Sequence, residues 1–125
     1  MSEDHPDSEN ILVLSAYTTE VLGRAGWRPG RTVDITYFER VLMLEGYEVF
    51  QPVRVFLTQF AGLRIRYIFA QRFEDVLHFD AAAAAEAITV ERVLAYSEAV
   101  GDRLCVIGEY HAEQYTLMMD TKGRV

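Results

Sequence analysis

The sequence predicts an α+β fold, with N-terminal helices packed on a mostly antiparallel sheet formed by the C-terminal half. Two observations support this prediction. Apolar residues recur at helical spacing in the stretches before Gly62, and they alternate with polar residues directly after it. Helices that precede the strands, instead of alternating with them, are typical of the α+β class. The length of 125 residues suits one domain. We place it at 11–125, after an acidic tail, 1–10, that we expect to be disordered.

Three helices are expected before Gly62. They are Ile11–Ala25, Thr32–Glu45 and Gln51–Ala61, and a glycine follows each of them. Thr32 is the expected N-cap of the second helix, with Asp34 in its first turn. The inner stripe of that helix is expected to be Val33, Tyr37, Val41 and Leu44. Trp27, the one tryptophan, is expected to anchor the loop between the first two helices to the core.

The second half is expected to supply the sheet and two more helices. Leu63–Phe69 alternates like a strand with one wet face, and Val76–Phe79 is its expected partner. The run Ala81–Ala85 has high helix propensity and little to bury. Further elements are a helix at Thr89–Val100 with Val90, Val93, Leu94 and Val100 inside, strands at Leu104–Glu109 and Tyr115–Met119, a turn at 120–123, and a new strand beginning at Arg124–Val125.

Composition and charge exclude several classes of function. Half of the residues are hydrophobic and 25% are charged, as in a globular protein. The net charge is −7, from 19 acids against 12 bases. Proteins that bind nucleic acid or anionic membranes need basic surfaces, so we expect neither as a partner. The acidic N-terminus does not resemble a signal peptide, and no apolar run could span a bilayer. These features predict a soluble, cytoplasmic protein.

The sequence contains no convincing catalytic constellation. Cys105, the one cysteine, lies in an apolar run, so we expect a buried thiol and not a nucleophile paired with His78 or His111. Neither a phosphate-binding glycine loop nor a nucleophile elbow occurs. In a strand, Glu109, His111 and Glu113 would share one face. A solvated hairpin tip explains this pattern more simply than a metal site. We therefore predict no enzyme activity, no cofactor and no metal.

Acidic residues are concentrated in the strand-rich half. Five acids and no Lys or Arg lie between Phe73 and Glu91, whereas residues 11–60 carry five acids and five bases. A solvated face is one interpretation of this distribution. The sharper hypothesis is an acidic surface for a basic protein partner. The candidate partner-binding residues are Glu74, Asp75, Glu109, His111 and Glu113.

Several segments occur in a familiar order along the chain. They are Gly26-Trp27-Arg28-Pro29-Gly30-Arg31, Val33-Asp34-Ile35, Phe56 to Leu63, His78-Phe79-Asp80, and Asp120 to Val125. Together they resemble the third subgroup of the SUKH superfamily of bacterial immunity proteins, over about Gly23 to Val125. The resemblance implies a non-catalytic cytoplasmic domain that neutralises a cognate toxin domain, often a nuclease. It carries over no catalytic or contact residues. Such proteins usually continue further, so we expect that a closing segment is missing after Val125.

Two alternative functions stay open. One is a regulatory or scaffolding domain of the same fold that binds another protein. The other is a small metal-dependent enzyme that uses the face of Glu109, His111 and Glu113. A missing closing strand would also leave a sheet edge exposed, and exposed edges pair with one another. A weak homodimer is therefore a further expectation.

Overall fold

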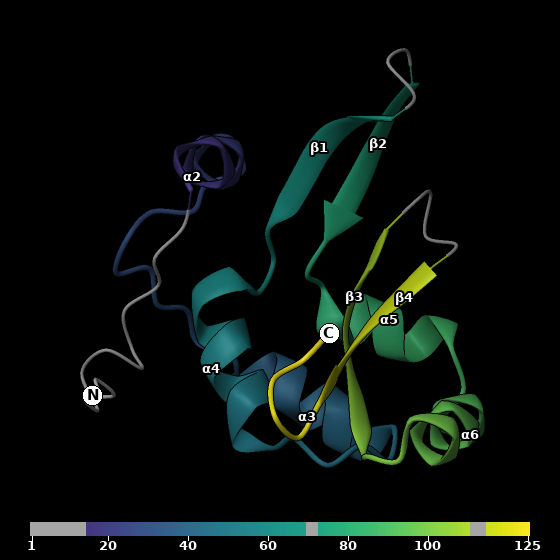
Figure 1. Ribbon diagram of the computed structural model, residues 1–125. Helices are drawn as coiled ribbons and strands as arrows, with labels where there is room; N and C mark the ends of the chain where they lie inside the picture. The colour runs from purple at the N-terminus through teal and green to yellow at the C-terminus, as the bar shows by residue number, and fades with distance from the viewer. Residues whose placement is uncertain (1–14, 70–72, 111–114) are drawn as a thin grey trace, which may run out of the picture.

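The computed structural model describes residues 15–69, 73–110 and 115–125, and it confirms the predicted α+β class (Figure 1). The expected tail, 1–10, lies outside the described residues. Within these ranges, three helices precede a four-stranded antiparallel sheet of order β1-β2-β3-β4, and two more interrupt it. The elements are α2 (Ala16–Arg24), α3 (Thr36–Leu44), α4 (Gln51–Phe60), β1 (Arg64–Phe69), β2 (Phe73–His78), α5 (Ala81–Ala87), α6 (Val90–Val100), β3 (Leu104–Tyr110) and β4 (Tyr115–Asp120).

The helix ends follow local capping chemistry, with one correction. The hydroxyl of Thr89 caps α6 by accepting a hydrogen bond from the Arg92 N–H. Helix α3, however, begins later than expected, at Thr36, so Thr32 is not its N-cap. The Asp34 carboxylate instead accepts hydrogen bonds from the Thr36 N–H and hydroxyl, at 2.9 and 2.6 Å. This Asx-type contact holds the chain in a turn just before the helix.

The sheet consists of two hairpins that are joined at one point. β1 pairs with β2 from Arg64 opposite His78 to its far end, and β3 pairs with β4 along its length. Among the described residues, β2 and β3 pair only at His78 and Glu109. Figure 1 shows the two hairpins spreading apart from this junction. The β1–β2 hairpin therefore projects from the body of the protein as an arm.

The main core surrounds β3. All five residues from Cys105 to Glu109 are buried, and since successive strand residues point to opposite faces, β3 is covered on both sides. Helix α5 packs against β3 and α3, with four of its alanines buried. The expectation that the alanine run has little to bury is therefore wrong. The small side chains let the helix backbone come close to the strand.

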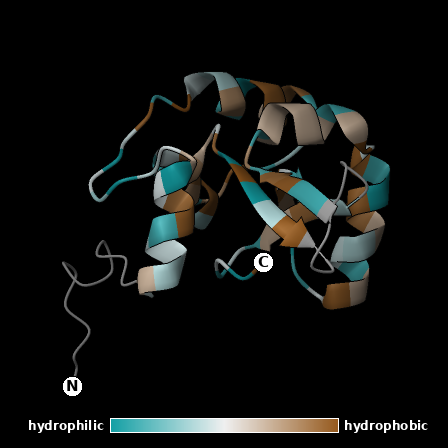
Figure 2. Cartoon of the chain, turned by 90° about the horizontal axis from the view of Figure 1, so that it is seen from above, coloured by the Kyte–Doolittle hydropathy of each residue, from teal (hydrophilic) through white to brown (hydrophobic). Residues whose placement is uncertain are grey.

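A second cluster fastens the N-terminal loop to the sheet. Trp27 is buried as predicted and stacks on Phe60, with ring centroids 6.0 Å apart. The Arg31 guanidinium donates to the carbonyl oxygens of Gln59 and Ala61 at the end of α4, at 2.5 and 3.0 Å. Cations at a helix C-terminus satisfy carbonyls that have no partner in the helix. The Gly26–Arg31 loop thus serves the fold. Figure 2 shows helix α2 next to this loop, with both hydrophilic and hydrophobic residues along it.

Two predicted inner stripes are partly wrong. In α3, Tyr37 and Leu44 are 62% and 79% exposed, whereas Leu42 is fully buried. The expected stripe was counted from Val33, which lies before the helix. The positions counted from it therefore did not all fall on the buried face of α3. In α6, Val93 is buried but Leu94 and Val100 are exposed. One further correction concerns the end of the chain. Arg124–Val125 forms no strand, because the Asp120 N–H bonds to the Arg124 carbonyl and closes a turn.

Candidate partner-binding surfaces

Glu74 and Asp75 lie on the projecting β1–β2 hairpin. Glu74 is exposed, and its Oε1 lies 3.4 Å from Nη1 of Arg66 on the neighbouring strand. The Asp75 carboxylate accepts a hydrogen bond from the Val76 N–H at 2.8 Å. Next to Glu74 is a hollow of about 350 Å³ that is also lined by Arg24, Arg64 and Arg66. The surroundings of Glu74 are therefore mixed in charge.

Glu109 is not on the surface but at the junction of the two hairpins. It is 3% exposed, and its Oε1 lies 3.1 Å from Nε2 of the equally buried His78. The sequence placed it in a solvated hairpin tip, and its burial corrects that interpretation. The other two residues of that expected tip, His111 and Glu113, lie outside the described residues. The structure therefore brings Glu109 together with His78, which the sequence did not pair with it.

The hydrogen bonds of His78 assign its proton. Its Nδ1 accepts from the Asp80 N–H at 3.1 Å, so that nitrogen carries no hydrogen. The ring is then the neutral Nε2–H tautomer, and Nε2 donates to the Glu109 carboxylate. The Asp80 carboxylate accepts from the Ala83 N–H and caps α5. The His78–Glu109 pair thus connects β2, β3 and the start of α5. These hydrogen bonds give the pair a structural role.

The described residues carry little that suggests catalysis. Burial raises the pKa of the Cys105 thiol to about 12, so it stays protonated and is a poor nucleophile at neutral pH. The thiol is fully buried, as the sequence predicted. Across residues 15–69, 73–110 and 115–125, no group of three or more His, Cys, Asp or Glu side chains could hold a metal ion.

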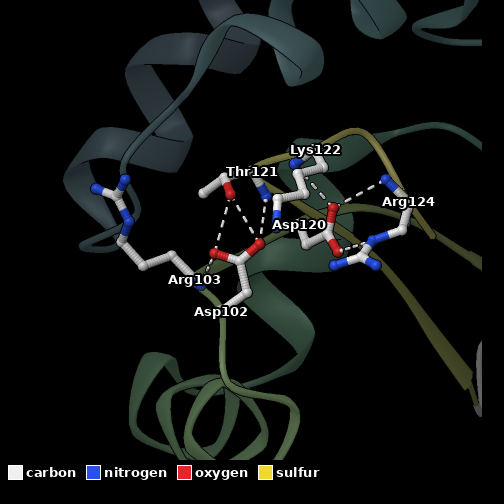
Figure 3. A network of polar contacts seen from close by, with 6 residues as sticks. All are labelled: Asp102, Arg103, Asp120, Thr121, Lys122 and Arg124. Atoms are coloured by element: carbon white, nitrogen blue, oxygen red, sulfur yellow. Dashed lines mark hydrogen bonds and ion pairs between the residues drawn. The ribbon is translucent and has the colours of Figure 1, made fainter.

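Two aspartates hold the C-terminal turn in place, and one of them, Asp102, joins it to the end of α6 (Figure 3). The Asp102 carboxylate accepts from the Thr121 hydroxyl at 2.7 and 2.9 Å and from the Thr121 N–H at 3.2 Å. These bonds, led by the hydroxyl, lower the pKa of Asp102. The Asp120 carboxylate accepts from the Lys122 and Arg124 N–H groups and from Arg124 Nε. These contacts, led by the Arg124 N–H, lower its pKa as well.

A second hollow lies where the end of α3 meets α6. Gly46 turns the chain there with a φ of +101°, and a Cβ on it would lie 3.4 Å from Val90 Cγ2. The hollow measures about 190 Å³, and Tyr47, Val90 and Leu94 are among its lining residues. The Glu48–Arg103 ion pair lies at the same place. We refer to this feature as the Tyr47 hollow.

One residue that lines the Tyr47 hollow has an exposed apolar side chain, and two more occur just before Gly46 in the sequence. Leu94, one of its lining residues, is 58% exposed, and Met43 and Leu44 at the end of α3 are 62% and 79% exposed. Grouped apolar residues on a surface often mark a binding site. Periodicity missed this one because it assigned Leu44 and Leu94 to the core. Charged neighbours could have indicated that these positions are exposed, since Glu45 follows Leu44 and Glu91 and Arg92 lie just before Leu94.

Comparison with known families identifies the chain's relatives. None of the described helices is both long and apolar enough to cross a membrane. No curated protein and no solved structure matches the chain. The family model of the SUKH-3 immunity protein, in contrast, matches residues 14–125, which span every described element of the fold. The chain therefore belongs to the SUKH-3 immunity protein family.

Proposed function

We propose that this protein is a non-catalytic, cytoplasmic immunity protein that binds a cognate bacterial toxin domain and neutralises it through an acidic surface. The observation that carries the proposal is the family match over residues 14–125. The family is one of immunity proteins, and immunity against a toxin domain requires a complex with it. The high pKa of the Cys105 thiol supports the non-catalytic part of the proposal.

The charge of the chain favours a basic toxin, and we propose one of the nuclease class. Nucleases bind phosphates and therefore carry basic surfaces. The immunity protein has a net charge of −7, and opposite charges accelerate association and favour the correct partner. An acidic protein that covers a phosphate-binding surface competes directly with the nucleic acid.

Co-expression with the toxin-like domain encoded next to this protein's gene tests the proposal. We expect growth to stop with the toxin domain alone and to recover with both proteins, which should copurify as a one-to-one complex. Their Kd should rise with salt concentration if the interface is acidic on this side. The absence of any adjacent toxin-like frame, together with no rescue from any toxin, would rule out the proposal. A pulldown of a housekeeping complex would instead indicate a scaffolding role.

A further inference from the structure

The hollow between α2 and β1 is lined by basic residues on a protein that is otherwise acidic. It measures about 350 Å³, and its lining includes Arg24 at the end of α2 together with Arg64 and Arg66 of β1. Helix α2 lies beside β1 (Figure 1). Alternate residues of a strand point to the same face, so Arg64 and Arg66 both project from the exposed face of β1. We refer to this feature as the α2–β1 hollow.

Positive charge exceeds negative charge around the α2–β1 hollow. Glu74, which also lines it, pairs with Arg66 at 3.4 Å, and Arg24 pairs with Glu20 of its own helix at 2.6 Å. Within the described part of the chain, Arg64 forms no ion pair. Both existing pairs are exposed, and exposed pairs are weak. A guanidinium group also has five N–H donors, so these arginines can accept further carboxylates.

The segment that precedes α2 carries the complementary charge. Residues 1–10 contain no Lys or Arg and four acids, Glu3, Asp4, Asp7 and Glu9. Their only apolar side chains are those of Met1 and Pro6, so they offer little to an apolar surface. A contact between this stretch and the folded part of the chain therefore has to be electrostatic, and the α2–β1 hollow supplies the cations.

The chain between the acidic stretch and α2 is long enough for this contact. The nine residues of α2 span roughly 13 Å, which separates Ala16 from Arg24 at the hollow. From Glu9 to Ala16 the chain can span up to roughly 23 Å. A segment joined to its site by so short a linker binds as if it were present at millimolar concentration. Ion pairs that are too weak to bind a separate peptide can therefore bind this one.

We propose that the acidic stretch of residues 1–10 binds in the α2–β1 hollow of the same chain. Its carboxylates pair with Arg64 and with the remaining N–H donors of Arg24 and Arg66. Because Arg64 and Arg66 belong to the projecting β1–β2 hairpin, the bound stretch connects this arm to α2. It also covers the basic residues, so that the protein presents a more uniformly acidic surface to a basic partner.

The first test places a spin label in the acidic stretch of the full-length protein. A nitroxide is attached at Ser8→Cys, and the broadening of amide resonances is measured by NMR. Cys105 is fully buried, so the label reacts at the introduced cysteine. We expect the resonances of Ile65 and Tyr67 in β1 to lose roughly half of their intensity or more. They should recover in about 1 M salt, where the screening length is only about 3 Å.

Two double variants separate binding from the effect of the tether. Arg64→Gln with Arg66→Gln should remove most of the broadening in β1. Arg40→Gln with Arg92→Gln removes the same charge from α3 and α6 and should leave the broadening unchanged. All four arginines are exposed, so each variant should fold. Equal broadening in the two double variants would be due to the tether alone and would overturn the proposal.

The second test neutralises the acidic stretch itself in the full-length protein. Its four acids are replaced by amides in Glu3→Gln, Asp4→Asn, Asp7→Asn and Glu9→Gln. We expect the amide hydrogens of β1 to exchange with solvent about 2- to 5-fold faster, because a contact worth a few exposed ion pairs is lost. The matched control changes four exposed acids elsewhere and should leave these rates unchanged, with Glu45→Gln, Glu86→Gln, Glu91→Gln and Glu98→Gln.

Two outcomes of these experiments would contradict the proposal. Unchanged exchange rates in β1 after neutralisation of the stretch would show that it does not bind there, and the prediction of a disordered tail would stand. The other outcome concerns a different occupant. If the spin label reports no contact while the toxin domain encoded by the adjacent gene loses affinity for the Arg64→Gln, Arg66→Gln variant, the α2–β1 hollow belongs to the toxin interface.

Discussion

Single residues decide how closely the two hairpins approach. A Cβ on Gly108 would lie 2.1 Å from the carbonyl oxygen of His78, far inside any allowed contact. Gly108 also lies where the β3–β4 register shifts. The absence of a side chain there allows both the β-bulge and the close approach of the β2 backbone. The buried His78–Glu109 hydrogen bond is next to it and depends on the same spacing.

Gly108→Ala is expected to destabilise the protein by about 2–3 kcal/mol or more, because the backbone of β2 would have to move. The free energy of unfolding from urea titrations measures the loss. Gly23→Ala is the matched control. Gly23 lies in α2 with nothing within 4 Å of an added Cβ, so its replacement should stabilise by roughly 0.5–1 kcal/mol. Similar values for both variants would contradict the close contact.

The residues that the sequence predicted well are those whose role depends on hydrophobicity. Trp27 and Cys105 are buried as expected, since a bulky ring in a loop and a thiol in an apolar run have few alternatives. Glu109 and Tyr47 were not predicted. A buried carboxylate needs a particular partner, His78, which lies 31 positions away in the chain. The pattern of residues around Glu109 does not indicate which distant residue will contact it in the fold.

Among the elements, α5 shows how small side chains define a contact. Ala81 and Ala84 are fully buried between the helix and its neighbours. Replacing Ala84 with leucine should cost about 1–3 kcal/mol, because the added atoms would overfill a packed interface. Ala87→Leu, at an exposed position of the same helix, should change stability by less than about 0.5 kcal/mol. Chemical denaturation of both variants provides the measurement, and equal stabilities would argue against close packing of α5.

The C-terminal turn should respond to pH. Hydrogen bonds from Thr121 and Arg124 lower the pKa of Asp102 and Asp120 below the ordinary value of about 3.9. The folded state therefore prefers the ionised carboxylates. Their contribution to stability is complete above about pH 5 and is lost as the pH falls through the lowered folded pKa.

Asp102→Asn should thus reduce the free energy of unfolding at pH 7, and the difference from the wild type should shrink at pH 3 and below. Urea titrations at pH 7, 5 and 3 measure this difference. Glu86→Gln, at an exposed position near the end of α5, is the control and should have little effect at any of these values. A difference that stays constant down to pH 2 would show that ionisation of Asp102 does not matter.

Element boundaries were predicted best where the capping chemistry is local. Helix α4 begins at Gln51 as predicted, and α6 begins at Val90, one residue after the predicted start at Thr89, which serves as its N-cap. The start of α3 was missed because the Asp34–Thr36 turn delays it. Counting from the wrong start also led us to predict Leu44 as buried, although it is exposed. The spread between β2 and β3 could not be predicted, because it depends on how two hairpins meet.

At the scale of the whole molecule, the segregation of helices and strands was sufficient to predict the α+β class. The sheet formed by the described strands ends at β1 and β4. We therefore keep the prediction of a weak homodimer through a sheet edge. Light scattering should show a mass that rises above 14.3 kDa with concentration.

Two edge variants identify the strand involved. Ile68→Lys adds a charge to β1, where Ile68 is 66% exposed, and Thr116→Lys adds one to β4. Charged residues on an edge strand oppose pairing. The variant whose mass stays at that of the monomer at every concentration identifies the edge strand through which two copies pair. A wild-type mass that stays at 14.3 kDa at high concentration would rule out the dimer.

Because β2 and β3 pair only at His78 and Glu109 among the described residues, the two hairpins of the sheet are weakly coupled to each other. A force applied to the β1–β2 hairpin can reach β3 through this one sheet contact, and it reaches α5 through the bond between the His78 ring and the Asp80 N–H. The base of the hairpin is also held by an apolar cluster, in which Ile65 and Leu77 pack with Trp27 and Phe60. The amide hydrogens of β2 away from His78 should exchange with solvent before those of β3, which identifies the arm as the part that yields first.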